Sequence, residues 1–345
     1  MMNRSSILLI YTGGTIGMRE DPVSHSLKPF DFSLLMSEVP ELSKFAGKID
    51  YYTFEPLIDS SDVEPKVWQE ICEIIYRRYD DYDGFVVLHG TDTMAYSASA
   101  LSFMMDGLGK PVIFTGSQLP VGSPRTDGKE NLISSVEIAS AKGRDQKALV
   151  PEVCIYFDSL LLRGNRCTKV NADQFDAFRS PNYPALATAG IEIRFNRDNI
   201  HYTSQKSLSI NTSLDTRVSI LKVHPGITEH VARHMLLDPD IRAVILETYG
   251  SGNSISKPWF TDIVKESCAR GKIVLNVTQC LSGIVDMSRY ATGRALQEAG
   301  VVSGRDMTTE AALAKLFVLM GRTDSNEEVK ALLTVSQKGE LTQQL

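Results

Sequence analysis

Threonines stand directly after two short apolar runs of the sequence, one of them beside a carboxylate. The run at residues 6–11 leads into Thr12-Gly13-Gly14-Thr15, and the run at 85–88 leads through His89 into Gly90-Thr91-Asp92-Thr93. A threonine hydroxyl is a weak nucleophile at neutral pH and needs a base close by. His89 is either that base or a packed core residue. Lys169 is either a lysine tuned toward base chemistry by a carboxylate or an ordinary exposed lysine.

Two further extended runs end in residues of the same kinds. Val112 to Phe114 leads into Thr115-Gly116-Ser117-Gln118, and Tyr52 to Ile58 leads into Asp59-Ser60-Ser61-Asp62. Unbroken apolar runs are typical of strands buried on both faces of a parallel sheet, and ligands bind at the carboxyl edge of such sheets. The repetition at four strand ends predicts a site there, and it outweighs the alternative that Asp92 merely caps the following helix.

Strands and helices alternate along the chain, which predicts an α/β fold with right-handed crossovers. The length of 345 residues favours two domains. A polar, aperiodic segment at 196–215 is the expected linker. It separates a larger N-terminal parallel-sheet α/β domain, residues 1–195, from a smaller C-terminal flavodoxin-like α/β domain, residues 216–345.

Two segments have a more specific local expectation. Residues 18–29 contain two prolines and little periodicity, so we expect a loop over the strand edge that closes as a lid on bound substrate. Residues 160–169 are expected to form a hairpin with its turn at Gly164-Asn165.

The composition excludes several classes of function. A net charge of −6 without any cluster of Lys and Arg argues against a nucleic-acid partner. No apolar run approaches the roughly 20 residues that cross a bilayer, so no membrane is expected. The five cysteines are widely spaced with no C-x-x-C, which indicates neither disulfides nor zinc and fits a reducing cytoplasm. His230 and His234 have metal-ligand spacing but lack an H-E-x-x-H signature, so no metal is expected.

Known nucleotide and hydrolase motifs are absent from the sequence. The turn at residues 13–17 is G-G-x-x-G rather than G-x-G-x-x-G, and it lacks the G-K-[ST] of a P-loop. No G-x-S-x-G nucleophile elbow occurs. No cofactor is expected.

The two threonine-rich motifs together carry a family resemblance. Residues 11–17 and 88–94 resemble the two signatures of the bacterial-type L-asparaginase family, and the similarity continues through 115–118, 163–169 and 278–280. It is greatest to the cytoplasmic type I branch. The resemblance implies hydrolysis of L-asparagine to L-aspartate and ammonia without a cofactor, in a homo-oligomer that is a dimer or a tetramer.

The resemblance also implies residue roles. Thr15 would be the nucleophile, with Lys169 as base, Thr91 as proton relay and Asp92 as orienter. Backbone N–H groups near Thr91 would stabilise the oxyanion. The substrate-binding residues implied are Asp59, Ser60, Ser61, Gly90, Ser117 and Asn253, the last of them in a neighbouring subunit.

The sequence departs from the family pattern in two places. Leu27 stands where members usually carry a tyrosine, which puts a Thr–Tyr activation route in doubt. The positions of a second, activating asparagine site match Thr168, Glu247 and Cys280, but regulated members carry arginine at Glu247. Glutamate offers only acceptors where arginine offers donors, so we expect hyperbolic kinetics.

Two other functions remain open from the sequence. One is the asparaginase-like subunit of a tRNA-dependent amidotransferase, which normally has an extra N-terminal domain. The other is a non-catalytic bilobal amino-acid-binding protein, which would give no reason for Thr15, Thr91 and Lys169 to converge.

Overall fold

The computed structural model describes residues 5–20, 27–29, 39–120, 123–205 and 207–343. Contacts divide the chain into two compact units, Met1–Ile210 and Asn211–Leu345. The division falls inside the segment predicted as linker, and the exact domain limits stay a prediction.

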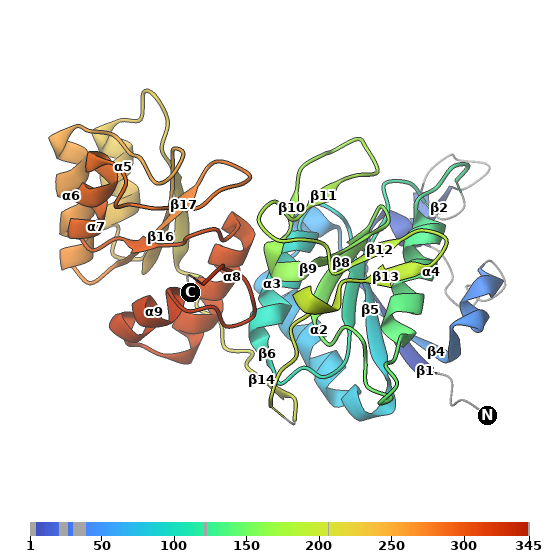
Figure 1. The fold of residues 1–345 in the computed structure, drawn as a ribbon. Coiled ribbons are helices and arrows are strands. Elements are labelled where there is room, and N and C mark those ends of the chain that lie inside the picture. Colours follow the sequence, from blue (N-terminus) through green and yellow to red (C-terminus); the bar gives the residue numbers. More distant parts are fainter. Residues whose placement is uncertain (1–4, 21–26, 30–38, 121–122, 206, 344–345) are drawn as a thin grey trace. The chain divides into compact units, whose positions relative to one another are not determined.

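The first unit is built on an eight-stranded sheet (Figure 1). Its strands, in sheet order, are β13 (Ile193–Phe195), β12 (Ala187–Ala189), β9 (Leu160–Arg163), β8 (Val153–Phe157), β7 (Val112–Thr115), β5 (Gly84–Leu88), β1 (Ser5–Tyr11) and β4 (Ala46–Thr53). The five strands from β8 to β4 are parallel to one another. The other three are joined by antiparallel pairings, β9 to β8, β12 to β9 and β13 to β12. The carboxyl ends of β4, β1, β5 and β7 therefore lie side by side, as the sequence predicts.

Helices cover both faces of this sheet (Figure 1). They are α2 (Pro65–Arg77), α3 (Met94–Met104) and α4 (Gly128–Ser140). Apolar residues of α4 pack with alternate residues of β1 and β5, such as Leu9 and Val86, in one core cluster. Three short antiparallel pairs complete the unit: β2 (Met18–Glu20) with β3 (Leu27–Pro29), β6 (Met105–Asp106) with β14 (Ser209–Ile210), and β10 (Thr168–Lys169) with β11 (Phe178–Arg179).

Three local expectations need correction. The strand expected over Tyr52 to Ile58 is β4, which ends at Thr53, and a cis Glu55–Pro56 bond follows it. The expected hairpin with a turn at Gly164-Asn165 is wrong: β8 and β9 form the hairpin, and Asp158 and Ser159 make its turn with positive φ. The ends of the segment 18–29 pair as β2 and β3, while residues 21–26 of the expected lid lie outside the described residues.

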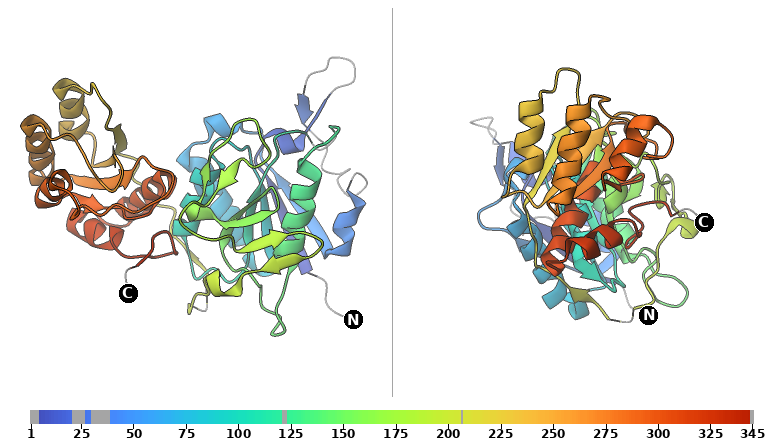
Figure 2. Two further views of the ribbon diagram at one scale, coloured as in Figure 1. Left: turned by 45° about the horizontal axis from the view of Figure 1, so that its top comes forward. Right: turned by 90° about the vertical axis from the view of Figure 1, so that its left-hand side faces the viewer.

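The second unit has four parallel strands in chain order (Figure 2). They are β15 (Val218–Lys222), β16 (Ala243–Thr248), β17 (Ile273–Thr278) and β18 (Val302–Ser303). One face packs against α5 (Glu229–Leu237), α6 (Pro258–Ala269) and α7 (Ala291–Glu298), and the other against α8 (Thr309–Arg322) and α9 (Asn326–Leu333).

Both units confirm the predicted α/β class. One detail of the second unit differs from the flavodoxin arrangement. That arrangement reverses its strand order at a switch point, whereas β15 to β18 follow the chain without reversal. Successive right-handed crossovers in one direction place α5, α6 and α7 on the same face.

Candidate active site

Three turns at the carboxyl ends of β1, β4 and β5 pack against one another with no room for side chains. A Cβ atom on Gly13 would lie 2.1 Å from the carbonyl oxygen of Ile58, and one on Gly14 would lie 2.6 Å from the Cα of Gly90. A Cβ on Gly90 would lie 2.4 Å from Ser60 Oγ. Gly13 and Gly14 also have φ of 143° and 88°, which L side chains rarely adopt. Glycine at these positions is what lets the turns meet.

Hydrogen bonds fix the same three turns. The Thr12 amide and hydroxyl both donate to the carbonyl oxygen of Leu88, at 3.0 and 3.1 Å. The Ile58 amide donates to the Thr12 carbonyl oxygen at 2.8 Å. Thr12 is buried, and its amide and hydroxyl are both used in the hydrogen bonds between these turns. Its hydroxyl is therefore not offered to a ligand.

Thr15 opens the short 3-10 helix η1 (Thr15–Gly17) directly after Gly14. The Tyr11 hydroxyl donates to the Gly14 carbonyl oxygen at 3.3 Å, and a Cβ on Gly17 would strike the Tyr11 ring at 2.1 Å. Burial raises the pKa of Tyr11, which keeps it a donor. Thr15 itself is half-buried, and among the described residues its hydroxyl makes no hydrogen bond. That hydroxyl is therefore available to a ligand.

Lys169 lies between two side chains of the turn after β5. Its Nζ donates to Thr91 Oγ1 at 2.8 Å and to Asp92 Oδ1 at 2.7 Å. The Lys169 side chain is 19% exposed and that of Asp92 is 61% exposed. The ordinary exposed lysine is thus the wrong alternative, and the carboxylate faces solvent where a charged ligand can reach it.

Lys169 is positioned by contacts that sequence reasoning missed. The guanidinium of Arg163, which is buried at the end of β9, donates to both carboxylate oxygens of Glu152 at 2.6 and 3.1 Å. The chain then forms the 3-10 helix η6 (Gly164–Arg166), where a Cβ on Gly164 would lie 3.0 Å from the Cβ of Ala98 in α3. β10 follows and carries Lys169. No motif marks Glu152 as the partner, because 11 residues and a strand turn separate it from Arg163.

The turn after β4 supplies a second carboxylate. Asp59 accepts hydrogen bonds from the Ser61 amide and hydroxyl at 3.0 and 2.9 Å, and these bonds lower the pKa of the Asp59 carboxyl. Asp59 thereby caps η4 (Ser60–Asp62). Thr93 Oγ1 donates to the Ser60 carbonyl oxygen at 2.7 Å, and the Asp92 amide to Ser60 Oγ at 3.4 Å. These bonds hold Asp59 and Asp92 on adjoining turns.

Ser117 lies in the turn after β7, and its hydroxyl forms a hydrogen bond within that turn. It is 3% exposed, and its hydroxyl donates to the Leu119 carbonyl oxygen at 2.6 Å. The next residue, Gln118, donates through its side-chain amide to the Gln174 carbonyl oxygen at 3.1 Å, which ties this turn to the segment that follows β10. A substrate contact of Ser117 would use its remaining acceptor capacity.

His89 is a packed core residue. Its Nδ1 lies 2.7 Å from the Gly90 carbonyl oxygen, which only accepts, so Nδ1 carries the proton. Its Nε2 lies 3.0 Å from Ser97 Oγ, which in turn accepts from Trp68 at 2.9 Å. Burial lowers the pKa of His89 to about 4. The hypothesis that His89 is the base is therefore wrong, since the ring is enclosed and both nitrogens are engaged.

The other predicted site residues divide between the units. Thr168 neighbours Lys169 in the first unit, while Asn253, Glu247 and Cys280 belong to the second. Asn253 closes a turn with Tyr249 through backbone bonds and accepts from Thr292 at 3.0 Å. Glu247 accepts from Thr309 at 2.7 Å, and Cys280 is exposed. Their predicted roles are not tested by these contacts.

Among the described residues, no group of three or more His, Cys, Asp or Glu side chains is arranged to hold a metal ion. Within the same part of the chain, no helix is long and apolar enough to cross a membrane.

Comparisons with known proteins agree over nearly the whole chain. Residues 6–201 match the family model described as Asparaginase, N-terminal, and residues 217–333 match the Glutaminase/Asparaginase C-terminal domain. L-asparaginase 1 of Escherichia coli K12 is 44% identical over 99% of both chains. A Mus musculus 60 kDa lysophospholipase is 40% identical over 97% of this chain and 62% of its own length. The crystal structure of L-asparaginase I from Vibrio cholerae matches with a TM-score of 0.88 and 42% identity, over 99% of this chain and 100% of that one.

The close approach of the turns predicts that one added methyl group lowers the stability of the folded chain. We expect Gly90→Ala to lower the free energy of unfolding by about 1–3 kcal/mol, the usual cost of overpacking, because its Cβ meets Ser60 at 2.4 Å. Gly109→Ala is the matched control, since its nearest neighbour is Tyr79 Oη at 3.5 Å. Urea unfolding of both variants measures the difference, and equal stabilities would refute the steric argument.

The buried neutral imidazole predicts an acid-sensitive stability. The pKa of His89 is about 4 in the folded chain, below the ordinary 6.5, so the unfolded chain binds the proton first. Stability from this residue is present above pH 6.5 and is lost as the pH falls toward 4, by about 3 kcal/mol in all.

We therefore expect His89→Gln to flatten the fall in unfolding free energy between pH 6.5 and 4, measured by urea titration at each pH. At neutral pH the variant keeps the site geometry, because Gln also offers a donor and an acceptor. An unchanged pH slope would show that His89 is not the buried titrating group.

Proposed function

The chain belongs to the asparaginase family, and we propose that it hydrolyses L-asparagine to L-aspartate and ammonia with Thr15 as the nucleophile. The observation that carries the proposal is the position of Lys169 Nζ, 2.8 Å from Thr91 Oγ1 and 2.7 Å from Asp92 Oδ1. This cluster stands on the turn against which the Thr15 turn packs, through Gly14 and Gly90.

The reaction needs two attacks on the same carbon. Thr15 Oγ attacks the side-chain amide carbon, its proton ends on the departing nitrogen, and ammonia leaves an ester on Thr15. Water then attacks the ester carbon, which restores the Thr15 hydroxyl and releases aspartate. Lys169 acts as base and Thr91 as the proton relay that activates the water, with Asp92 orienting Lys169.

The oxyanion that forms at each attack needs donors. Backbone N–H groups of the turn that begins at Gly90 are proposed for this role, which is typically worth about 3–4 kcal/mol per donor. They cost no reorganisation at the moment of reaction, because the turn is already fixed by its contacts with Ser60.

A zwitterionic amino acid also needs partners at its other end. Asp92 and Asp59 are the proposed acceptors for the α-ammonium, and both carboxylates are accessible on adjoining turns. Ser60 is proposed to donate its hydroxyl to the α-carboxylate. Ser61 and Ser117 already donate their hydroxyls to Asp59 and to the Leu119 carbonyl oxygen, so they are proposed to contact the substrate as acceptors. Asn253 is proposed to complete a neighbour's site in a homo-oligomer, a dimer or a tetramer, of cytoplasmic location.

Two proposals on this site stay open to experiment. The lid at residues 18–29 and the route that replaces a loop tyrosine involve Leu27, whose side chain is not described. The second site at Thr168, Glu247 and Cys280 is proposed not to activate the enzyme, because Glu247 is an acceptor engaged with Thr309.

The substrate is tested by ammonia release from free asparagine and free glutamine. We expect kcat/KM for asparagine to exceed that for glutamine by about 10- to 200-fold, the discrimination that one methylene usually gives in a fitted pocket. No ammonia from either amide by the folded, purified chain would favour an amino-acid-binding protein. Glutamine hydrolysis seen only with a partner complex would favour an amidotransferase subunit.

The roles of Thr15 and Lys169 are tested with substitutions of similar size. Thr15→Val and Lys169→Met should each lower kcat by at least about a thousand-fold, as removal of a nucleophile or its base does. Thr188→Val and Lys44→Met are matched controls at exposed positions of the same unit, and we expect wild-type kcat from both. Near-normal turnover by a folded Thr15 or Lys169 variant would remove that residue from the mechanism.

A further inference from the structure

A cavity of about 1130 Å³ lies at the edge of the first sheet opposite the threonines. It is lined by residues that precede β5, β7 and β8, such as Asp83, Lys110 and Pro151, and by residues of the segments 142–149 and 197–205. The threonine turns follow the carboxyl ends of the same parallel strands. A strand of five residues spans about 17 Å, so the cavity is separate from the proposed active site.

The charge lining the cavity is positive in a chain whose net charge is −6. Five cationic side chains line it against two carboxylates, which leaves three positive charges in excess. The cations are Lys110, Lys142, Arg144, Lys147 and Arg197. A concave surface lined by one sign of charge concentrates ligands of the opposite sign.

Both carboxylates are already engaged within the wall. Asp83 pairs with Lys142 at 2.9 Å and accepts from the Ser6 amide at 2.9 Å. Asp145 accepts from the Lys147 amide at 3.2 Å. Asp83 is therefore neutralised by Lys142, whereas Asp145 keeps its charge beside Arg144 and is already counted in the excess of three.

The inner cation is held in place by carbonyl groups. Lys110 donates through Nζ to the backbone oxygens of Tyr79 and Tyr82, and burial lowers its pKa. An anion in the cavity would offset that burial. Arg144, Lys147 and Arg197 are exposed at the rim, and within the described residues none of the three forms an ion pair.

The walls of the cavity are fixed by hydrogen bonds. The Gly143 amide donates to the Lys147 carbonyl oxygen at 2.8 Å, so the basic loop is a closed turn. The Tyr202 hydroxyl donates to the Leu149 carbonyl oxygen at 2.8 Å and joins the two walls. Glu152 accepts from the His201 amide and anchors the same segment to the sheet. Tyr202 is 52% exposed and lines the same cavity as the cations.

We propose that this cavity binds a small ligand carrying two or more phosphate groups, either a nucleoside polyphosphate or an inorganic one. Arg and Lys are the side chains that recognise phosphate, and three uncompensated cations match the charge of a di- or triphosphate. The Tyr202 face suits the base of a nucleotide. The volume slightly exceeds the roughly 300–1,000 Å³ of a typical small-molecule site, which leaves room for a nucleoside as well as its phosphates.

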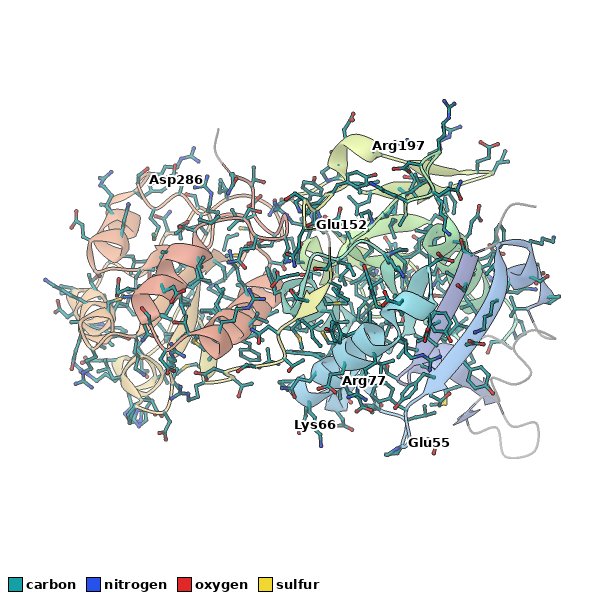
Figure 3. All side chains as sticks on the ribbon, turned by 90° about the horizontal axis from the view of Figure 1, so that it is seen from below. Glu55, Lys66, Arg77, Glu152, Arg197 and Asp286 are labelled. Carbon is teal, nitrogen blue, oxygen red and sulfur yellow. The ribbon has the colours of Figure 1, made fainter. Side chains whose placement is uncertain are left out.

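The test is isothermal titration calorimetry of the full chain with ATP and, separately, with inorganic tripolyphosphate. The variant is Arg144→Glu with Lys147→Glu, at two exposed loop positions. Its matched control is Lys44→Glu with Lys66→Glu, which changes the net charge equally at exposed positions that do not line the cavity. Figure 3 shows Lys66 on the opposite side of the first unit from Arg197.

We expect saturable binding to the wild-type chain, weakened at least ten-fold in the loop variant and less than two-fold in the control. Tighter binding of ATP than of tripolyphosphate would indicate that the nucleoside contacts Tyr202. Equal affinities would indicate that the cavity recognises only the phosphates. Equal weakening in the loop variant and the control would show that affinity depends only on the net charge of the chain, and it would overturn the proposal. Absence of binding by both ligands would overturn it as well.

Discussion

The contact on which the site depends is the packing of backbone against backbone at Gly13, Gly14 and Gly90. Any Cβ at these positions would approach a neighbouring turn to between 2.1 and 2.6 Å, well inside van der Waals contact. The approach brings the turns after β1, β4 and β5 to one place, so that Thr15, Asp59 and Thr91 occupy adjoining turns. Parallel pairing of the three strands sets the register of those turns. The proposed site therefore depends on the absence of side chains at these three glycines.

A buried ion pair lies just before the segment that carries Lys169, the proposed base. Arg163 and Glu152 are 4% and 6% exposed, and their bidentate contact fixes the point at which β9 leaves the sheet. Lys169 follows six residues later. Glu152 also accepts from the amide of His201, the residue before Tyr202 in the cavity wall. Removing one member of such a pair leaves an uncompensated buried charge. The pair thus lies at the amino-terminal end of the parallel strands, and the chain runs from it to Lys169 at the opposite end.

Sequence reasoning located the strand ends and the threonines because both depend on local signals. Apolar runs, glycine turns and short hydroxyl-rich motifs predicted β1, β5 and β7 within a residue or so, together with the residues that gather at their ends. The hairpin at β8 and β9 was misplaced because its turn uses Asp158 and Ser159 rather than glycine or asparagine, so the Gly164-Asn165 pair gave a stronger false signal. The state of His89 depends on Ser97, which lies 8 residues further along the chain, and through it on Trp68 in α2. Burial of the ring identifies His89 as a core residue and not a base. No local sequence pattern indicates that a polar ring is buried.

The hydrogen bonds around Lys169 constrain how two attacks can share one base. Lys169 contacts the hydroxyl of Thr91 but makes no hydrogen bond to that of Thr15 within the described part of the chain. The proposed transfer of the Thr15 proton to Lys169 would therefore pass through an intermediary in the first attack, such as the bound substrate or a water. In the second attack, the hydrogen bond from Lys169 to Thr91 offers a route for the proton of a water that reaches the Thr91 hydroxyl. We therefore propose that Lys169 and Thr91 act most directly in hydrolysis of the ester, and that formation of the ester is the step most sensitive to how Asp59 and Asp92 orient the amide.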